Sequence, residues 1–150
     1  MKGFRRQKKA FTLIELIVVI AIIAILSAIA TVSALAILRS NEKKSAQTTL
    51  TNDWKLTSQA FDQINLGYTT VKRPTTAFIA SRLGLSTSSI TLTTSECTSL
   101  SKGRVHIQYI ENPENLRTRY QIKRITINYN GNYYFTENGK DVRGPRDSLG

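Results

Sequence analysis

The sequence predicts an α+β protein in which a long N-terminal α-helix packs on a small antiparallel β-sheet. Residues 11–38 form an apolar run, which is a candidate transmembrane half of that helix. Residues 39–66 carry apolar side chains at helical spacing, as an amphipathic second half would. Residues 105–136 alternate with the period of two that is typical of strands. Because a few strands cannot bury their apolar face alone, the amphipathic half is expected to cover them.

The apolar run has the length and composition of a membrane span. At about 1.5 Å per residue, residues 11–38 would form a helix of roughly 42 Å, and a hydrocarbon core is about 30 Å thick. Glu15 is the single charged residue of the run. An acid near the bilayer centre costs about 2.5–3.5 kcal/mol, so Glu15 must either reach the interface or meet a partner. A simple single-pass anchor is therefore one interpretation of this segment.

Residues 1–10 form a basic leader, which supplies much of the net charge of +11 of the 150-residue chain. It has no acidic residue, and its basic residues are Lys2, Arg5, Arg6, Lys8 and Lys9. A secretory signal peptide has a shorter apolar stretch of about 7–15 residues, with a small residue at a cleavage site after it. Here the small residue, Ala10, precedes the run. The leader predicts a cytoplasmic N-terminus and an extracytoplasmic domain over residues 39–150.

The stretch from Ala10 to Glu15, Ala-Phe-Thr-Leu-Ile-Glu, is the most specific motif of the chain. Over residues 8–30 the sequence resembles the N-terminus of a type IV prepilin or pseudopilin. The resemblance implies that a prepilin peptidase cuts between Ala10 and Phe11, and that Phe11 is N-methylated. Glycine is the usual residue before the cut and alanine is a tolerated minority. Many members of the family also have a proline where this chain has Val32.

The resemblance implies a structural subunit, a major or minor pilin, of a type IV pilus-like filament that serves adhesion, twitching motility or DNA uptake. Such a subunit would be inserted once in the cytoplasmic (inner) membrane and cut by the prepilin peptidase. It would then polymerise with sister pilins on an assembly platform into an extracellular pilus. A type II secretion pseudopilin and a DNA-binding minor pilin of a DNA-uptake pilus are the alternatives.

Glu15 has a physical role in such an assembly. A cut before Phe11 would free an α-ammonium at the start of the apolar helix. The Glu15 carboxylate, four residues along, could meet the ammonium of a neighbouring subunit in an apolar bundle, where each charge alone would be costly. A slip along the axis would separate the two charges. Glu15 is therefore predicted to be the charge that sets filament assembly.

The second half of the helix is predicted to bury one face. Its apolar stripe comprises Ala46, Leu50, Trp54, Phe61 and Ile64, with Trp54 and Phe61 as the floor of the domain. The polar remainder comprises Arg39, Glu42, Lys43, Asp53, Lys55 and Asp62. Neither proline nor glycine interrupts residues 11–66, and Gly67 supplies a stop. One helix to about residue 66 is expected.

The rest of the chain is predicted as a loop over residues 67–104, a β-meander over 105–136 and a polar tail over 137–150. Within the loop, Thr76–Leu83 is expected to form a short helix that ends at Gly84. The Ser/Thr-rich run from Ser86 to Ser101 fits an ordered loop packed on the sheet, with a low-complexity linker or O-glycosylation as alternatives.

Turns and a kink are expected within the meander. The alternation changes parity near Lys123-Arg124, which predicts a β-bulge. Asn130-Gly131 is a strong hairpin signal, with a return strand over Asn132–Thr136.

The residue types give no support for catalysis or for a cofactor. The chain has one cysteine, Cys97, so an intrachain disulfide is impossible, and its one histidine, His106, lies in an expected strand. No metal-ligand spacing or phosphate loop is present in the sequence, so no enzyme, metal or cofactor is predicted. Arg117, Arg119 and Lys123 could share a strand face and bind DNA phosphates, although a solvated basic face is the preferred interpretation.

Overall fold

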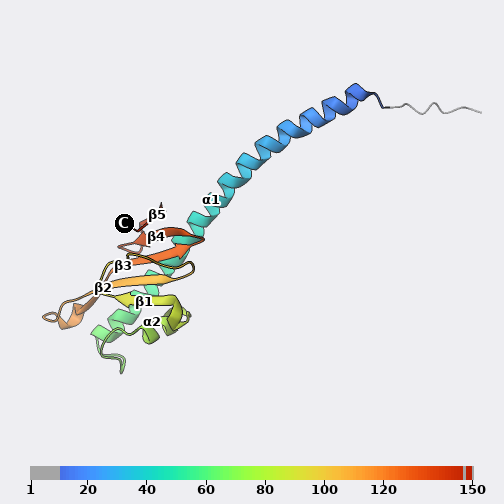
Figure 1. Cartoon of the computed structure of the whole chain (residues 1–150). Coiled ribbons are helices and arrows are strands. Elements are labelled where there is room, and N and C mark those ends of the chain that lie inside the picture. Colours follow the sequence, from blue (N-terminus) through green and yellow to red (C-terminus); the bar gives the residue numbers. More distant parts are fainter. Residues whose placement is uncertain (1–10, 147, 150) are drawn as a thin grey trace, which may run out of the picture. The chain divides into compact units, whose positions relative to one another are not determined.

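The computed structural model describes residues 11–146 and residues 148–149. The chain divides into two units, one ending at Ser40 and the other starting at Asn41. Helix α1 (Leu13–Asn65) contributes its first part to one unit and its second part to the other (Figure 1).

Helix α1 ends in a Schellman motif. Gly67 adopts the left-handed conformation, with φ of 75°. The Tyr68 N–H donates to the Gln63 carbonyl over 2.9 Å, and the Gly67 N–H donates to the Ile64 carbonyl over 3.2 Å. These bonds satisfy carbonyls that the end of a helix leaves unpaired. The predicted single helix, with its stop at Gly67, is confirmed.

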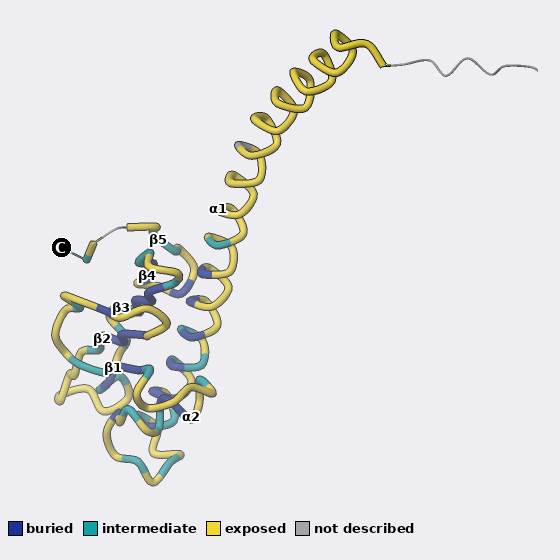
Figure 2. The backbone as a smooth tube through the Cα atoms, turned by 45° about the vertical axis from the view of Figure 1, so that its right-hand side comes forward, coloured by how far each residue is buried: buried dark blue, intermediate teal, exposed yellow. Residues whose placement is uncertain are grey.

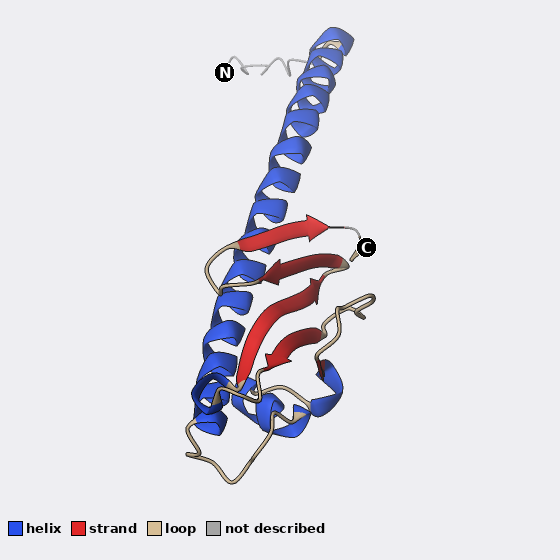
Figure 3. Ribbon diagram, turned by 90° about the vertical axis from the view of Figure 1, so that its left-hand side faces the viewer, coloured by secondary structure: helices blue, strands red, loops and turns tan. Residues whose placement is uncertain are grey.

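The second unit, in the part of the chain that the structure describes, contains one sheet with strand order β1-β2-β3-β4-β5 (Figure 1). The second part of α1 runs along one face of this sheet (Figure 3). Strands β1 and β2 are parallel, and every other neighbouring pair is antiparallel. After α1 the elements are α2 (Thr76–Leu83), β1 (Ile90–Thr93), β2 (Val105–Glu111), β3 (Tyr120–Tyr129), β4 (Asn132–Thr136) and β5 (Val142–Arg146), with the 3-10 turns η1 (Thr87–Ser89) and η2 (Leu116–Thr118). A long N-terminal helix against a mostly antiparallel sheet confirms the predicted fold class.

The sheet is wider than the sequence predicts. Strand β1 lies in the segment 67–104 that is predicted as loop, and β5 lies in the predicted polar tail. Both are edge strands, which pair on one side only and need no clear alternation. Strand β5 even contains Pro145, which an edge strand tolerates because no neighbour requires its missing N–H. Helix α2 occupies the predicted residues and ends at Gly84.

The predicted bulge and hairpin are both present. Gln108 of β2 pairs with Arg124, and the next residue of β2 pairs with Ile122, so Lys123 is the extra residue of β3. The β3–β4 hairpin turns at Asn130 and Gly131, whose φ angles of 53° and 92° suit a two-residue turn. The parity switch and the Asn-Gly pair were therefore sufficient signals for this part of the sheet.

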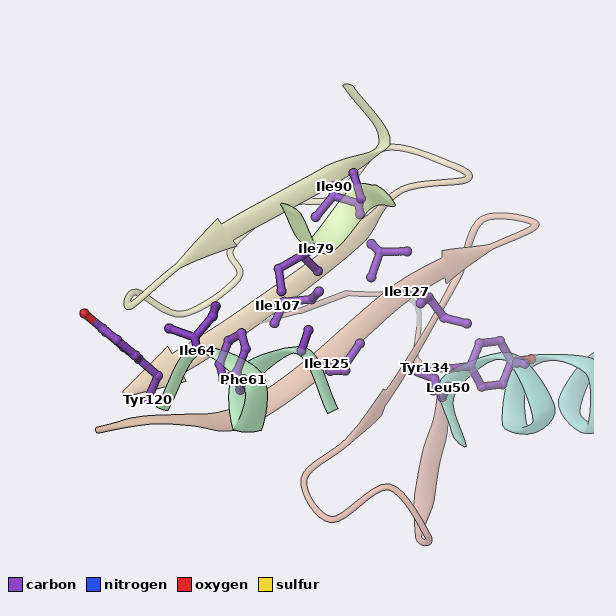
Figure 4. Packing of buried hydrophobic residues seen from close by; sticks show 14 residues of the cluster. Leu50, Phe61, Ile64, Ile79, Ile90, Ile107, Tyr120, Ile125, Ile127 and Tyr134 are labelled. Atoms are coloured by element: carbon purple, nitrogen blue, oxygen red, sulfur yellow. The ribbon is translucent and has the colours of Figure 1, made fainter. Parts of the chain in front are cut away.

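The core lies between the second part of α1 and one face of the sheet (Figure 2). Leu50 of α1, Ile107 of β2 and Ile125 of β3 are all fully buried. The ring of Phe61 meets Tyr109 edge-on at 5.9 Å between centroids. Each such side chain stabilises the fold by about 1.5–3 kcal/mol when it leaves water. Figure 4 shows these isoleucines and Phe61 gathered between the helix and the strands.

Asp53, not Trp54, occupies the buried centre of the helix stripe. Asp53 is 6% exposed, whereas Trp54 is half-buried at the margin of the core. The physical reason is helical phase, because the buried residues of this face alternate steps of four and three along the helix, a series that includes Asp53 and not Trp54: Ala46, Leu50, Asp53, Thr57, Ala60 and Ile64. The indole of Trp54 instead lies against Gly139, where a Cβ would overlap it. The sequence interpretation of Asp53 as part of the polar remainder is therefore wrong.

The Asp53 carboxylate is poorly compensated in this position. Neither Asp53 Oδ2 nor Thr57 Oγ1 has a hydrogen-bond partner among the described residues. Burial raises the pKa of Asp53 from its ordinary 3.8 to about 6. An ionised Asp53 therefore destabilises the fold.

The Ser/Thr-rich segment covers the other face of the sheet. The Gln108 side chain donates to the Thr94 carbonyl over 3.2 Å, and the Asn128 side chain donates to the Leu100 carbonyl over 2.7 Å. Both side chains are buried beneath the segment. The interpretation as an ordered loop packed on the sheet holds for the part from Thr94 to Leu100, whereas Ile90–Thr93 of the same run forms β1. The hydrogen bonds explain why polar residues occupy buried strand positions there.

We expect Asp53→Asn to stabilise the protein in a pH-dependent way. Because the folded pKa lies above the unfolded one, the stability of the wild type should fall between about pH 4 and pH 6 and stay low above that range. At about pH 7.5 the variant should exceed the wild type by up to about 3 kcal/mol, and near pH 4 the difference should vanish. Urea unfolding of the full chain in neutral micelles measures this.

The matched control is Asp62→Asn, which changes an exposed acid on the same helix. This variant should follow the wild type at both pH values. A stability gain for Asp53→Asn that is equal at both pH values would contradict the ionisation argument.

Candidate functional site

Helix α1 begins with a reciprocal capping box. Thr12 precedes the first helical residue, Leu13, and its Oγ1 accepts a hydrogen bond from the Glu15 N–H over 3.3 Å. In return, Glu15 Oε2 accepts bonds from the N–H and from the hydroxyl of Thr12, each 2.9 Å long. The box satisfies backbone donors that the start of a helix leaves unpaired. The carboxylate is thereby held against the first turn.

Sequence reasoning missed this local role of Glu15. The signal was present, because Thr12 and Glu15 stand at the capping-box spacing of a threonine followed three residues later by a glutamate. Both bonds from Thr12 end on Oε2, and Oε1 has no hydrogen bond among the described residues. A second interaction of the same carboxylate with another molecule is therefore sterically and chemically compatible with the cap.

The first part of α1 presents apolar side chains around its whole circumference. Every residue over 11–31 and 33–40 is exposed, and Leu13 and Leu26 are 78% and 61% exposed (Figure 2). Among the described residues, α1 is the helix that is long and apolar enough to cross a membrane. A helix that is apolar on all sides is stable only where lipid or other apolar helices cover it.

Three hydroxyl groups in the middle of this part, those of Ser27, Thr31 and Ser33, are satisfied by the helix itself. Ser27 donates to the Ile23 carbonyl over 2.7 Å, and Thr31 donates to the Ser27 carbonyl over 2.8 Å. Ser33 bonds the Ile29 carbonyl in the same way over 3.2 Å. Hydroxyls that bond back along the helix need no water. The segment therefore suits a dry environment along this stretch.

The predicted cleavage site falls at the edge of what the structure describes. Ala10 lies outside the described residues. Phe11 is the first described residue, and its side chain is 82% exposed. Thr12 and the start of α1 follow directly, so Glu15 lies one helical turn from the predicted new N-terminus.

Arg117, Arg119 and Lys123 do not share a strand face, contrary to the prediction. Arg117 lies in η2 and Arg119 follows that turn, while Lys123 is the bulged residue of β3. The turn forms because Asn115 Oδ1 accepts a bond from the Arg117 N–H over 3.2 Å. An Asn side chain that bonds the backbone two residues on favours a turn over a strand.

The charges of these residues are also partly compensated. Arg119 Nη2 lies 2.8 Å from Glu111 Oε1, and hydrogen bonding from this guanidinium lowers the pKa of the Glu111 carboxyl. Lys123 Nζ lies 3.7 Å from Glu96 Oε1. Arg117 has no carboxylate within 4.0 Å in the described part of the chain. A phosphate-binding patch depends on uncompensated charge, so the geometry gives DNA binding at these residues little support.

His106 and Cys97 have structural surroundings. His106 is buried in β2, its Nε2 lies 3.3 Å from Thr93 Oγ1, and burial lowers its pKa. Cys97 is half-buried in the covering loop, and its thiol lies 3.6 Å from the Ser99 carbonyl. Within the described residues, no group of three His, Cys, Asp or Glu side chains is placed to hold a metal ion.

An apolar N-terminal helix that continues along a small α+β domain is a pilin-like architecture. Residues 5–31 match the family model described as the prokaryotic N-terminal methylation motif, which is the signature of type IV pilins and pseudopilins. The match confirms the resemblance inferred from residues 8–30. No curated protein and no solved structure gave a match to the chain.

The motif and the helix together suggest a pilin-like or pseudopilin subunit. The motif implies assembly with other pilin subunits and processing by a prepilin peptidase. Together with the apolar helix, it is consistent with anchoring in the inner membrane.

We expect Thr12→Ala to loosen the start of α1 without altering the charge at Glu15. Loss of a capping side chain costs about 1 kcal/mol, which corresponds to roughly fivefold faster opening of the first turn. Hydrogen exchange of the Glu15 and Leu16 amides, which donate to Thr12, measures this in micelles. Amides beyond the first turn, such as that of Ala24, serve as the internal control and should exchange as in the wild type. Unchanged exchange at Glu15 would contradict the capping box.

Proposed function

We propose that this chain is a structural subunit, a major or minor pilin, of a type IV pilus-like filament that is assembled from the inner membrane. The observation that carries the proposal is the first part of α1, which is exposed on every side and begins with the methylation motif. Such a helix leaves the membrane only if other apolar helices replace the lipid. Identical neighbours that repeat along an axis replace it and generate a filament.

Glu15 and the N-terminal amine of Phe11 form the assembly contact in this proposal. A cut after Ala10 would create the amine one helical turn before the carboxylate. Glu15 Oε1 takes no part in the capping box and is available to an ammonium of a neighbouring subunit. Between apolar helices each charge alone would be strongly disfavoured, whereas the pair is tolerated. The capping box would hold the carboxylate in place before the neighbour arrives.

The N-terminus of the assembled form tests the proposal first. We expect the surface-exposed form to begin at Phe11, with a methyl group on its amine, because the peptidase removes residues 1–10. Intact mass and N-terminal sequencing of filaments sheared from the cells measure this. Ala10→Leu places a bulky side chain at the cut and should accumulate a membrane-bound precursor. A surface form that retains residues 1–10 would contradict the proposal.

A pair of variants separates the charge of Glu15 from its capping role. Glu15→Gln keeps an acceptor oxygen for the capping box but cannot pair with an ammonium. It should insert in the membrane and yet be depleted from sheared filaments by about tenfold or more, because the ammonium would be left unpaired between apolar helices. Thr12→Ala weakens the cap but keeps the charge, and it should assemble. Immunoblots of the sheared and membrane fractions measure both.

The two variants give distinct outcomes. If Glu15→Gln assembles as the wild type does, the Glu15 carboxylate does not pair with the ammonium. If Thr12→Ala fails to assemble while Glu15→Gln assembles, the helix cap rather than the charge controls incorporation.

A further inference from the structure

The ring of Phe135 is surrounded by guanidinium groups on the sheet face that turns away from α1. Its neighbour in β4, Tyr134, belongs to the core, and alternation places Phe135 on the opposite face. The guanidinium carbons of Arg146, Arg124 and Arg143 lie 4.8, 5.1 and 5.9 Å from the ring centroid. These arginines come from β5 and β3, the strands on either side of β4. All of them are thus held near one point of the surface.

A bulge in β5 brings both of its arginines to this face. Arg143 pairs with Phe135 and Arg146 pairs with Tyr133, so three steps along β5 match two steps along β4. In a regular strand, residues three apart point to opposite faces. The extra residue corrects the parity, and Gly144 permits it, because its φ is 127° and a Cβ would lie 2.6 Å from the Tyr133 carbonyl oxygen.

The bulge in β3 does the same for Arg124. Ile122 and Ile125 both face the core, although they are three residues apart. Lys123 is the extra residue between them, and this leaves Arg124 on the outer face beside Phe135. Bulges re-aim side chains and occur often beside functional sites. Separate irregularities in β3 and β5 thus converge on the same ring.

The positive charge of this cluster exceeds its local compensation. Glu137 Oε1 lies 2.6 Å from Arg124 Nη2, and Glu137 Oε2 lies 3.8 Å from Arg143 Nη1. Arg146 is exposed and has no carboxylate within 4.0 Å among the described residues. Hydrogen bonding from Arg124 lowers the pKa of Glu137, so this carboxylate is ionised at neutral pH. Among the described residues, Glu137 is the carboxylate that lies within 4.0 Å of the cluster formed by Arg124, Arg143 and Arg146, so the cluster retains excess positive charge.

We infer that Arg124, Arg143 and Arg146 around Phe135 form a binding site for a tetrahedral dianion, a phosphate or sulfate group. The planar fork of arginine matches the oxygens of such a group and binds it through paired hydrogen bonds. A dianion balances more of this excess charge than a carboxylate ligand does. The cation–π contacts with Phe135 hold the guanidinium groups near one another, so that less side-chain freedom is lost on binding.

The test is a titration of the full chain, in neutral micelles at constant ionic strength, with inorganic phosphate and with sulfate. Side-chain Nε–H NMR signals of the arginines report which residues respond. We expect signals of Arg143 and Arg146 to shift and saturate. Arg146→Gln, which breaks no ion pair within the described chain, should weaken binding by about tenfold. Acetate and dimethyl phosphate, which carry one charge, should bind several-fold more weakly than phosphate. Because dimethyl phosphate is a diester, its weaker binding also distinguishes a terminal phosphate from the phosphodiester of a polymer.

Arg82→Gln is the matched control. Arg82 also lies over a phenylalanine ring, 5.2 Å from the centroid of Phe78, but no other arginine of the described chain shares that ring. The Arg82→Gln variant removes the same charge as Arg146→Gln, and it should change the affinity for phosphate by less than about twofold. Equal losses in the two variants would reduce the effect to net charge and overturn the site. If no signal shifts and saturates, the arginines only cover Phe135 and the site does not exist. If acetate binds as tightly as phosphate, the inferred preference for a dianion is wrong.

Discussion

One constraint underlies the other features of the molecule: lipid or other apolar helices must cover the apolar first part of α1. Its side chains are apolar on all sides, its hydroxyls bond back to the helix, and its one acid is held by Thr12. Nothing in this stretch calls for water, and nothing in the described part of its own unit covers it. The segment is therefore stable only in lipid or among similar helices. Membrane insertion would remove this apolar surface from water, and the proposed polymerisation would do the same.

The second part of α1 meets the opposite requirement with the same helical geometry. Its apolar side chains are confined to one face, and the sheet covers that face. Asp53 is the exception, because it lies at the centre of the stripe and lacks a full set of partners. The unit tolerates it because Leu50, Phe61 and the isoleucines of β2 and β3 supply a larger stabilisation. The helix is continuous across both parts because neither glycine nor proline interrupts it.

Much of this fold could be predicted from the sequence where a local signal decides the outcome. The Gly67 stop, the helix Thr76–Leu83, the bulge at Lys123 and the Asn130-Gly131 hairpin each depend on neighbouring residues. The edge strands β1 and β5 could not be predicted in this way, because a neighbouring strand rather than alternation defines them. Asp53 was assigned to the polar face because its side chain is charged, although its position in the helical repeat places it on the buried face. For the candidate site, the motif identified Phe11 and Glu15, whereas the arginines around Phe135 converge only through tertiary pairing.

The loop that covers the outer sheet face is fastened by the side chains of Gln108 and Asn128 rather than by a covalent bridge. With a single cysteine in the chain, this attachment is indifferent to oxidants and reductants. The domain can therefore fold without an intrachain disulfide, in a reducing medium as readily as in an oxidising one. Dithiothreitol should therefore leave its surface loop in place.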